Sequence, residues 1–285
     1  MEIYQFEICS IGMELRAEKP IRPDAEMLRF AKPLHEPELT VLCRPVEQLP
    51  EPGTPLGQTP DSKVYRIENR IQRIAWGGKW PYAVLTYDPR DLRHVTLEIP
   101  QSDWDWVTRG LRLWIAACFP VLLLRFQSML IHASFIEYRG EGILFTAPSQ
   151  TGKSTQAELW RRYRGAEVIN GDKAGISLRG QAAVHSVPFS GTSGICKNRS
   201  LPLKAIVVLS QAPENTLRCL PAGQAVAAVC QNIFADHAVP EEWSGTMDLL
   251  LELVSRVPVY ALACTPDERA VCTLEQTLYP KEGEK

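Results

Sequence analysis

Apolar and polar positions alternate in places from residue 1 to about residue 41 of this 285-residue chain. Ile3, Phe6, Ile8 and Ile11 show this spacing near the start, and they predict short strands within residues 1–41. A stretch rich in Pro, Gly, Glu and Thr predicts a loop over 45–62. Further strands are expected at 64–74, 82–87 and 95–99, with a Gly77-Gly78 turn between the first two. We therefore expect a β-rich N-terminal region over residues 1–101.

After residue 101 the spacing of apolar residues alternates between a helical period and a strand-like period. A helix is expected over 102–118, capped by Ser102, and another is expected to begin at Thr265-Pro266, with Thr265 as its cap. Arg139-Gly140-Glu141-Gly142 predicts a tight hairpin turn. The other predicted helices are 154–164, 222–234 and 247–256. In the first of these, Ala157, Trp160 and Tyr163 fall on one apolar side. The predicted strands are 129–138, 143–146, 166–170, 176–178, 183–187, 204–210 and 259–263. We take residues 102–285 as a second domain that mixes strands and helices.

The most apolar segment, residues 113–131, does not predict a membrane anchor. It contains Pro120 and Arg125, and its uncharged part is well short of the ~20 residues that a spanning helix needs. The N-terminus lacks the basic start and long apolar core of a signal peptide. These features predict a protein without a membrane partner.

Charge and cysteine usage narrow the class of protein further. The net charge of −2 gives no sign of a nucleic-acid surface or of electrostatic membrane attachment. The eight cysteines are scattered and form no C-x-x-C pair, which disfavours a disulfide framework or a zinc site. Reduced thiols in a cytoplasmic protein are the plain interpretation.

The chemistry is concentrated in a short motif between a predicted strand and a predicted helix. Residues 147–154 follow the pattern A-x-x-x-x-G-K-S, a phosphate-binding loop with Ala147 at the first glycine position. Backbone N–H groups of such a loop, together with the positive end of the helix, cradle phosphate oxygens. Lys153 is expected to bridge the terminal phosphates and Ser154 to bind Mg²⁺. The predicted nucleotide-binding residues are Ala147, Pro148, Ser149, Gln150, Thr151, Gly152, Lys153, Ser154 and Thr155. The alternative is an ordinary strand-to-helix turn with an exposed lysine.

Four further side chains are candidates for catalysis. Asp172 follows the strand after the motif helix, a position suited to Mg²⁺ ligation or base chemistry, although an ordinary turn aspartate is the alternative. His132 is expected one strand away from the loop, where a core histidine is the simpler interpretation. Lys197 and Arg199 end a glycine- and hydroxyl-rich loop over 188–199 and are candidates to stabilise a transferred group.

These motifs together resemble a known family. Ile131-His132-Ala133-Ser134, Gly140-Glu141-Gly142, the loop 147–154 and Gly171-Asp172 resemble the C-terminal catalytic domain of HPr kinase/phosphorylase. They look still more like the HPr-kinase-like proteins related to ATP-dependent phosphoenolpyruvate carboxykinase. The resemblance covers about residues 128–278, and the N-terminal third is similar to the short β-rich region of the kinase-like proteins.

The resemblance implies an α/β fold, a PEP carboxykinase/HPr kinase-type P-loop nucleotide-binding domain with a mixed sheet. It implies Mg²⁺-dependent transfer of the γ-phosphoryl group of ATP to a hydroxyl. Lys153 would then hold the β- and γ-phosphates, and Ser154 would bind Mg²⁺. Asp172 would activate the acceptor or hold the metal, and His132 matches the family's histidine before the loop.

The sequence also departs from that family. Gly171-Asp172-Lys173 has one acid where relatives often have two, and the long arginine-bearing signature of HPr kinases is missing, so HPr is not the expected acceptor.

A kinase acting on a Ser/Thr hydroxyl of a peptide or protein, or on a small alcohol, is the first hypothesis. A catalytically weak nucleotide-binding accessory module, for example in peptide maturation, is the second. A true carboxykinase would need a Mn²⁺ site whose His and Lys ligands we do not find. The donor (ATP, GTP or pyrophosphate) and the oligomeric state, a homo-oligomer included, stay open.

Overall fold

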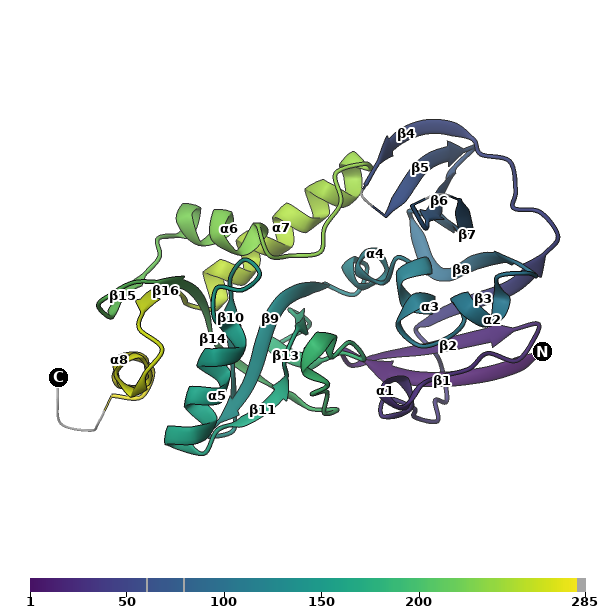
Figure 1. Ribbon diagram of the computed structural model, residues 1–285. Helices are drawn as coiled ribbons and strands as arrows, with labels where there is room; N and C mark the ends of the chain where they lie inside the picture. Colours follow the sequence, from purple (N-terminus) through teal and green to yellow (C-terminus); the bar gives the residue numbers. More distant parts are fainter. Residues whose placement is uncertain (60, 79, 281–285) are drawn as a thin grey trace. The chain divides into compact units, whose positions relative to one another are not determined.

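The computed structural model describes residues 1–59, 61–78 and 80–280 and divides into two compact units (Figure 1). The first unit comprises Met1–Phe126 and Ala235–Thr246, and the second comprises Gln127–Phe234 and the described residues from Met247 on. The division therefore lies near residue 126 and not at the expected residue 101. The intervening helices join the first unit because their apolar side chains pack on its strands, as with Trp114 against Phe6, whose ring centroids are 6.1 Å apart.

Within its described residues the first unit forms one eight-stranded sheet. Strand β3 pairs in parallel with β2 and β8, and the other neighbours pair antiparallel. The sheet order is β1 (Glu2–Ile8), β2 (Ile11–Ala17), β3 (Leu39–Val46), β8 (Asp91–Pro100), β7 (Pro81–Asp88), β6 (Arg70–Trp76), β5 (Ser62–Ile67) and β4 (Thr54–Gln58). Four short helices accompany it: α1 (Ala25–Leu28), α2 (Trp104–Val107), α3 (Leu111–Ala116) and α4 (Phe119–Leu124). The expected β-rich character of this region is confirmed.

Three predictions of elements in this unit were wrong. The strand expected over 64–74 is a hairpin of β5 and β6, which turns at Glu68 with a φ of 52°. The helix expected over 102–118 is broken at Gly110, whose φ is 57°, and it ends at Ala116, before Cys118 with a φ of 46°. Asp103 rather than Ser102 stands at its start. The loop expected over 45–62 contains β4, a mostly exposed edge strand. Its backbone pairs with β5, so it needs no apolar pattern of its own.

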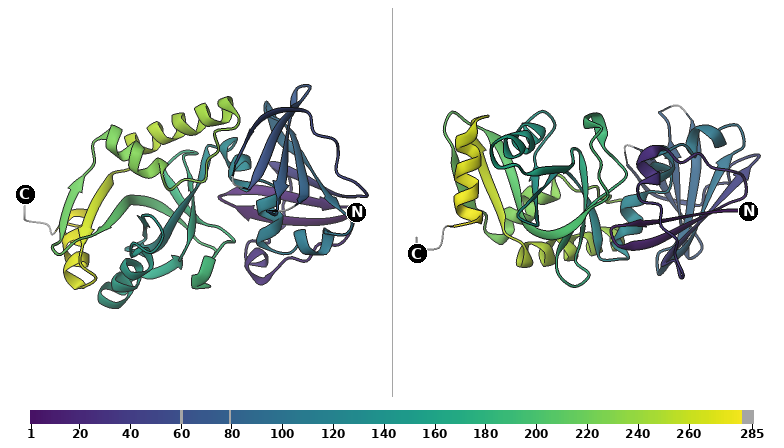
Figure 2. Two further views of the ribbon diagram at one scale, coloured as in Figure 1. Left: turned by 45° about the horizontal axis from the view of Figure 1, so that its top comes forward. Right: turned by 90° about the horizontal axis from the view of Figure 1, so that it is seen from below.

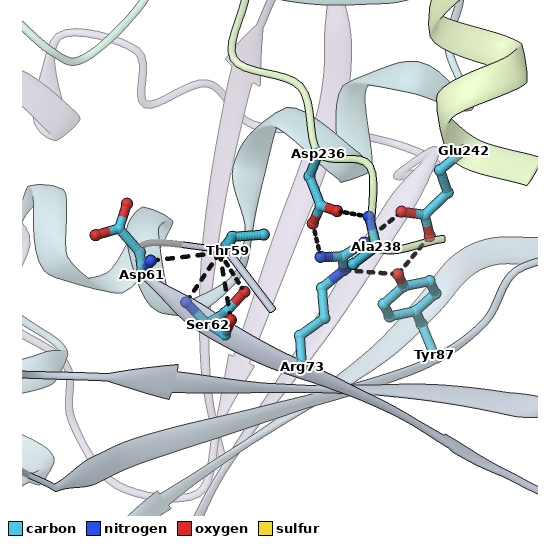
Figure 3. A network of polar contacts seen from close by, with 8 residues as sticks. All are labelled: Thr59, Asp61, Ser62, Arg73, Tyr87, Asp236, Ala238 and Glu242. Carbon is cyan, nitrogen blue, oxygen red and sulfur yellow. Dashed lines mark hydrogen bonds and ion pairs between the residues drawn. The ribbon is translucent and has the colours of Figure 1, made fainter. Parts of the chain in front are cut away.

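A buried ion cluster ties residues 235–246 to the first sheet (Figure 3). Arg73 on β6 is 1% exposed, and its guanidinium pairs with the carboxylates of Asp236 and Glu242. Its Nε also donates to the Tyr87 hydroxyl at 2.8 Å, and that hydroxyl donates to Glu242. Burial raises the pKa of Glu242 above its ordinary value. The buried cation thus has two anionic partners that come from a segment more than 160 residues away.

The second unit is a mixed α/β fold. Its strands are β10 (Glu141–Thr146), β9 (Ser128–Tyr138), β12 (Lys173–Ser177), β13 (Ala183–Ser186), β14 (Ser200–Gln211), β16 (Val259–Cys264) and β15 (Thr216–Cys219), in sheet order, with β11 (Glu167–Asn170) beside β9. Strand β14 pairs in parallel with β10 and β16, whereas the other pairs are antiparallel. Because β10 pairs with both β9 and β14, the order β10-β9-β12-β13-β14 closes on itself.

Strand β9 has three strand neighbours. Residues 128–132 pair with β12, residues 135–137 pair with β11, and residues 133–138 also pair with β10. Between the β12 and β11 segments, the backbone N–H of Ala133 donates to the carbonyl of Asp172 at 3.0 Å. His132 and Asp172 are therefore brought to the same point of the sheet by backbone pairing.

The helices of this unit are α5 (Lys153–Arg164), α6 (Ala222–Cys230), α7 (Pro240–Arg256) and α8 (Glu268–Leu278), and α7 begins within the first unit. Helices α5 and α8 lie side by side (Figures 1 and 2) and share one apolar core with β10, β14 and β16. Ala157 and Trp160 of α5 are buried in that core and Tyr163 packs against it, which confirms the predicted apolar side of this helix.

Two local predictions in the second unit have different outcomes. The hairpin turn is confirmed, since Arg139 and Gly140 have φ values of 55° and 77° between β9 and β10. The cap of α8 was wrong: Asp267 is the N-cap, accepting from the Arg269 N–H at 3.0 Å, and the helix begins after Pro266. The Asp267 carboxylate also pairs with the Arg269 side chain, at 2.6 Å.

Candidate functional site

The loop 147–152 joins the end of β10 to the start of α5, as the motif requires. Gly152 is the N-cap of α5 with a φ of 116°, and Gln150 has a φ of 64°. Such angles favour glycine because a β-carbon is strained there. Ala147 is fully buried in the apolar core beneath the loop, so its methyl group occupies core space. Pro148, Ser149 and Gln150 form the exposed crest of the loop, and Ser154 and Thr155 are exposed in the first turn of the helix.

Lys153 lies at the N-terminus of α5 and is only 8% exposed. Its Nζ donates to the carbonyls of Ala147 at 2.9 Å and of Pro148 at 3.2 Å. Burial lowers its pKa, while the nearby carboxylate of Asp172 acts in the opposite direction. The loop therefore holds an ammonium group at its centre, within electrostatic range of Asp172.

Asp172 is positioned by a buried asparagine. Asn170 ends β11, and its Oδ1 accepts from the backbone N–H groups of Asp172 at 3.0 Å and Lys173 at 3.1 Å. Its Nδ2 donates to the carbonyl of Val187 at 3.0 Å and to the Ser186 hydroxyl at 3.2 Å. The side chain of Asn170 thus forces the turn that presents Asp172 and anchors it to β13.

The carboxylate of Asp172 has two basic neighbours. His132 Nε2 lies 3.4 Å from its Oδ1, and the Lys173 ammonium pairs with its Oδ2. The hydrogen bond from His132 is the main cause that lowers the pKa of Asp172, to about 2, with Lys173 adding to it. Phe234 lies beside both bases, with its ring centroid 5.5 Å from Lys173 Nζ. Asp172 is therefore an ionised, oriented carboxylate.

The glycine-rich loop reaches Asp172 with its glycines and not with its cations. A β-carbon on Gly191 would lie 2.5 Å from Cγ of Asp172, so the backbone passes directly against the carboxylate. Lys197 instead pairs with Glu167 at 2.6 Å, and Arg199 pairs with Glu137 at 2.5 Å. Those two glutamates are register partners at the opposite end of β11. The structure thus brings His132 to Asp172, with Lys153 within electrostatic range of that carboxylate, and it keeps Lys197 and Arg199 with other partners.

Some residues around this site were not anticipated from the sequence. Asn170, Lys173 and Gly191 act through contacts with Asp172 that join different strands and loops. Only Asn170 carried a local signal, since an asparagine two residues before an aspartate suits an Asx turn. The contact of Gly191 has no such signal.

A pocket of about 490 Å³ opens beside the phosphate-loop motif. Its walls come from the start of α5 and from the carboxyl ends of β14 and β16. They are lined by Thr151, Gly152, Thr155, Gln156, Leu209, Gln211, Ala212, Cys264, Thr265 and Pro266. Ligands of open α/β sheets bind at this edge of parallel strands.

Few protein groups are available here to bind a magnesium ion. In the described part of the chain, no three His, Cys, Asp or Glu side chains gather as a metal site. Ser154 and Asp172 offer one hydroxyl and one carboxylate, which are hard oxygen donors of the kind Mg²⁺ prefers. Mg²⁺ bound by one or two protein groups plus phosphates and water fits this set.

These features define a mixed α/β protein in which a loop of phosphate-binding sequence pattern faces a single oriented aspartate. The chain belongs to the family described as SynChlorMet cassette protein ScmC, whose model matches residues 100–279. No curated protein matches the sequence.

Among solved structures, one match is the Hpr(Ser) kinase/phosphatase from Coxiella burnetii. The identity is 13% and the TM-score 0.31, over 52% of the present chain and 92% of that one. A similarity this low carries no conclusion about what the present chain does. Among the described helices, none has the length and apolar character needed to cross a membrane. Among the described residues, the cysteines form no disulfide.

Proposed function

We propose that the second unit binds Mg-ATP and transfers its γ-phosphoryl group to a hydroxyl acceptor. The acceptor is a Ser or Thr of a peptide or protein, or a small alcohol. The observation that carries this proposal is the buried ammonium of Lys153, held inside the loop 147–152 within electrostatic range of Asp172.

The loop has the groups that grip a polyphosphate. Backbone N–H groups of 150–153 and the N-terminus of α5 favour anionic oxygens. Lys153 is poised to exchange the carbonyls of Ala147 and Pro148 for phosphate oxygens, since an ammonium gains more from an anion than from a neutral carbonyl. Ser154 and Asp172 are the oxygen donors available to Mg²⁺, which when bound neutralises charge on the transferring group.

Asp172 orients the acceptor hydroxyl. With a pKa lowered to about 2, its carboxylate stays ionised and accepts a hydrogen bond from the hydroxyl. Phosphoryl transfer through a loose transition state requires mainly that the acceptor hydroxyl is positioned, so a weak base suffices. His132 holds the carboxylate in place from the neighbouring strand, at 3.4 Å. Lys173 must release one carboxylate oxygen for the acceptor or the metal to approach.

One observation favours the second candidate, a nucleotide-binding accessory module with little turnover. Each oxygen of the Asp172 carboxylate already has a basic partner, His132 or Lys173. A carboxylate that is neutralised in this way is a weaker metal ligand and a weaker base. A module of this kind would still bind Mg-ATP through the loop.

The test measures Mg-ATP affinity by calorimetry and phosphoryl transfer with labelled ATP and cell extract. Lys153→Ala should lose both, and Asp172→Asn should lose transfer by about 100-fold or more while lowering the affinity less than Lys153→Ala does. Lys204→Ala, which removes a lysine paired with Glu141 at 3.2 Å, is the matched control and should change neither. Absence of Mg-ATP binding in the wild type contradicts both candidates, and binding without any transfer supports the accessory module.

A further inference from the structure

We infer that the pocket beside the loop receives the base of the nucleotide and that Gln156 selects adenine over guanine. This inference rests on the proposed nucleotide binding and adds the identity of the base. The carrying observation is one buried amide that lines the pocket and whose oxygen has no hydrogen-bond partner among the described residues.

Gln156 is 2% exposed and nevertheless lines the pocket. Its Nε2 donates to the sulfur of Cys264, the last residue of β16, at 3.2 Å. Its Oε1 has no hydrogen-bond partner among the described residues. Buried polar side-chain atoms are nearly always hydrogen-bonded, so an unpaired acceptor lining a cavity indicates a ligand donor.

The position of Gln156 suits a base attached to phosphates in the loop. It follows Lys153 by three residues, so both side chains lie on one side of α5, about 4.5 Å apart along the axis. A nucleotide gripped at Lys153 can therefore fold its base over the first turn of the helix. Thr151 and Thr155 line the path between the two.

The walls of the pocket suit a flat heteroaromatic ring. Leu209 and Ala212 from the end of β14, and Pro266 after β16, supply apolar surface. The far wall is held by a reciprocal pair of bonds between Asn215 and Thr265, at 2.9 Å and 3.0 Å. The volume of about 490 Å³ lies in the range of small-molecule sites.

The chemistry of the amide then decides the base. With its Nε2 directed to Cys264, Gln156 presents an acceptor, which pairs with the exocyclic amino group of adenine. Guanine and hypoxanthine carry a carbonyl oxygen at that ring position, so two acceptors would face each other. A mismatch of this kind leaves buried polar groups unpaired, so it discriminates strongly against guanine and hypoxanthine.

The experiment compares Mg-ATP, Mg-GTP and Mg-ITP by calorimetry, with Mg-tripolyphosphate as a ligand that lacks a base. The wild type should bind ATP at least 10-fold more tightly than GTP or ITP. Gln156→Leu, which keeps the volume and removes the acceptor, should abolish that preference and leave tripolyphosphate binding unchanged. Gln156→Glu keeps an acceptor and should retain the preference, and melting curves report whether each variant is folded.

The outcomes separate this inference from the proposed function. Equal affinity of the wild type for the three nucleotides, or a preference for GTP, overturns the inference and leaves the phosphate cradle intact. Binding of tripolyphosphate with no gain from any base also overturns it. Failure to bind every one of these ligands contradicts the proposed function itself.

Discussion

Gly191 and Asp172 approach so closely that any side chain at residue 191 would collide with the carboxylate. A β-carbon there would lie 2.5 Å from Cγ and 2.8 Å from Oδ2 of Asp172, while φ of Gly191 is +58°. The glycine-rich loop thus forms a wall of backbone against the proposed catalytic carboxylate. Its contribution is space and shape, since its cations are paired elsewhere.

Gly191→Ala should therefore displace Asp172 and lower phosphoryl transfer at least 10-fold without lowering Mg-ATP affinity. Gly194→Ala is the matched control, because Gly194 has a similar φ of +65° but open space around its β-carbon. Both variants carry the backbone cost of a left-handed alanine, about 1 kcal/mol, and only the first meets the carboxylate. Equal transfer rates in the two variants would contradict the positioning role of the loop.

Gly152→Ala should weaken Mg-ATP binding. A φ of 116° at the N-cap of α5 is unfavourable for alanine, so the loop would change shape where its N–H groups must converge. Gly165→Ala places alanine at the opposite end of the same helix, at a φ of 65° and in open space. Calorimetry should show a loss of affinity only in Gly152→Ala, although both variants should melt at lower temperatures than the wild type. The same loss of affinity in Gly165→Ala would indicate a general effect on the helix.

The lowered pKa of Asp172 predicts how stability depends on pH. A carboxylate whose pKa is lower in the folded state stabilises the fold above its unfolded pKa of ~3.9. That contribution is lost as the pH falls toward about 2, the value in the folded protein. The melting temperatures of wild type and Asp172→Asn should therefore differ fully above pH ~5 and converge toward pH ~2. Asp248→Asn, on the exposed side of α7, is the control, and a gap that does not narrow would contradict the pairing with His132 and Lys173.

Arg73→Met should destabilise the protein by about 3–5 kcal/mol, because it leaves two carboxylates without their buried cation. Asp236 and Glu242 are only 14% and 12% exposed, so water replaces the lost partner poorly. Urea denaturation followed by tryptophan fluorescence measures the change. Arg93→Met removes an exposed arginine that pairs with Asp91 on the same strand, and it should have no measurable effect. A similarly small effect of Arg73→Met would show that the cluster contributes little to stability.

Predictions from sequence succeeded where the cause was local. The turn at Arg139-Gly140 and the apolar side of α5 depend on residues a few positions apart. The same holds for the order of strand, loop and helix around Lys153. They failed where a single backbone angle mattered, as at Gly110 and Cys118, because a hydrophobic period does not register a local break.

The sequence by itself determined the A-x-x-x-x-G-K-S pattern of the loop, the single acid at Asp172 and the alternation of strands and helices. Tertiary structure alone decided which residues meet: Gly191 against Asp172, Asn170 beneath it, and Lys197 and Arg199 away from it. It also decided that Arg73 has its partners beyond residue 234 and that Gln156 faces a pocket. The reason is physical: local spacing sets the backbone of each element, whereas strand register and loop paths set contacts between residues far apart in the chain.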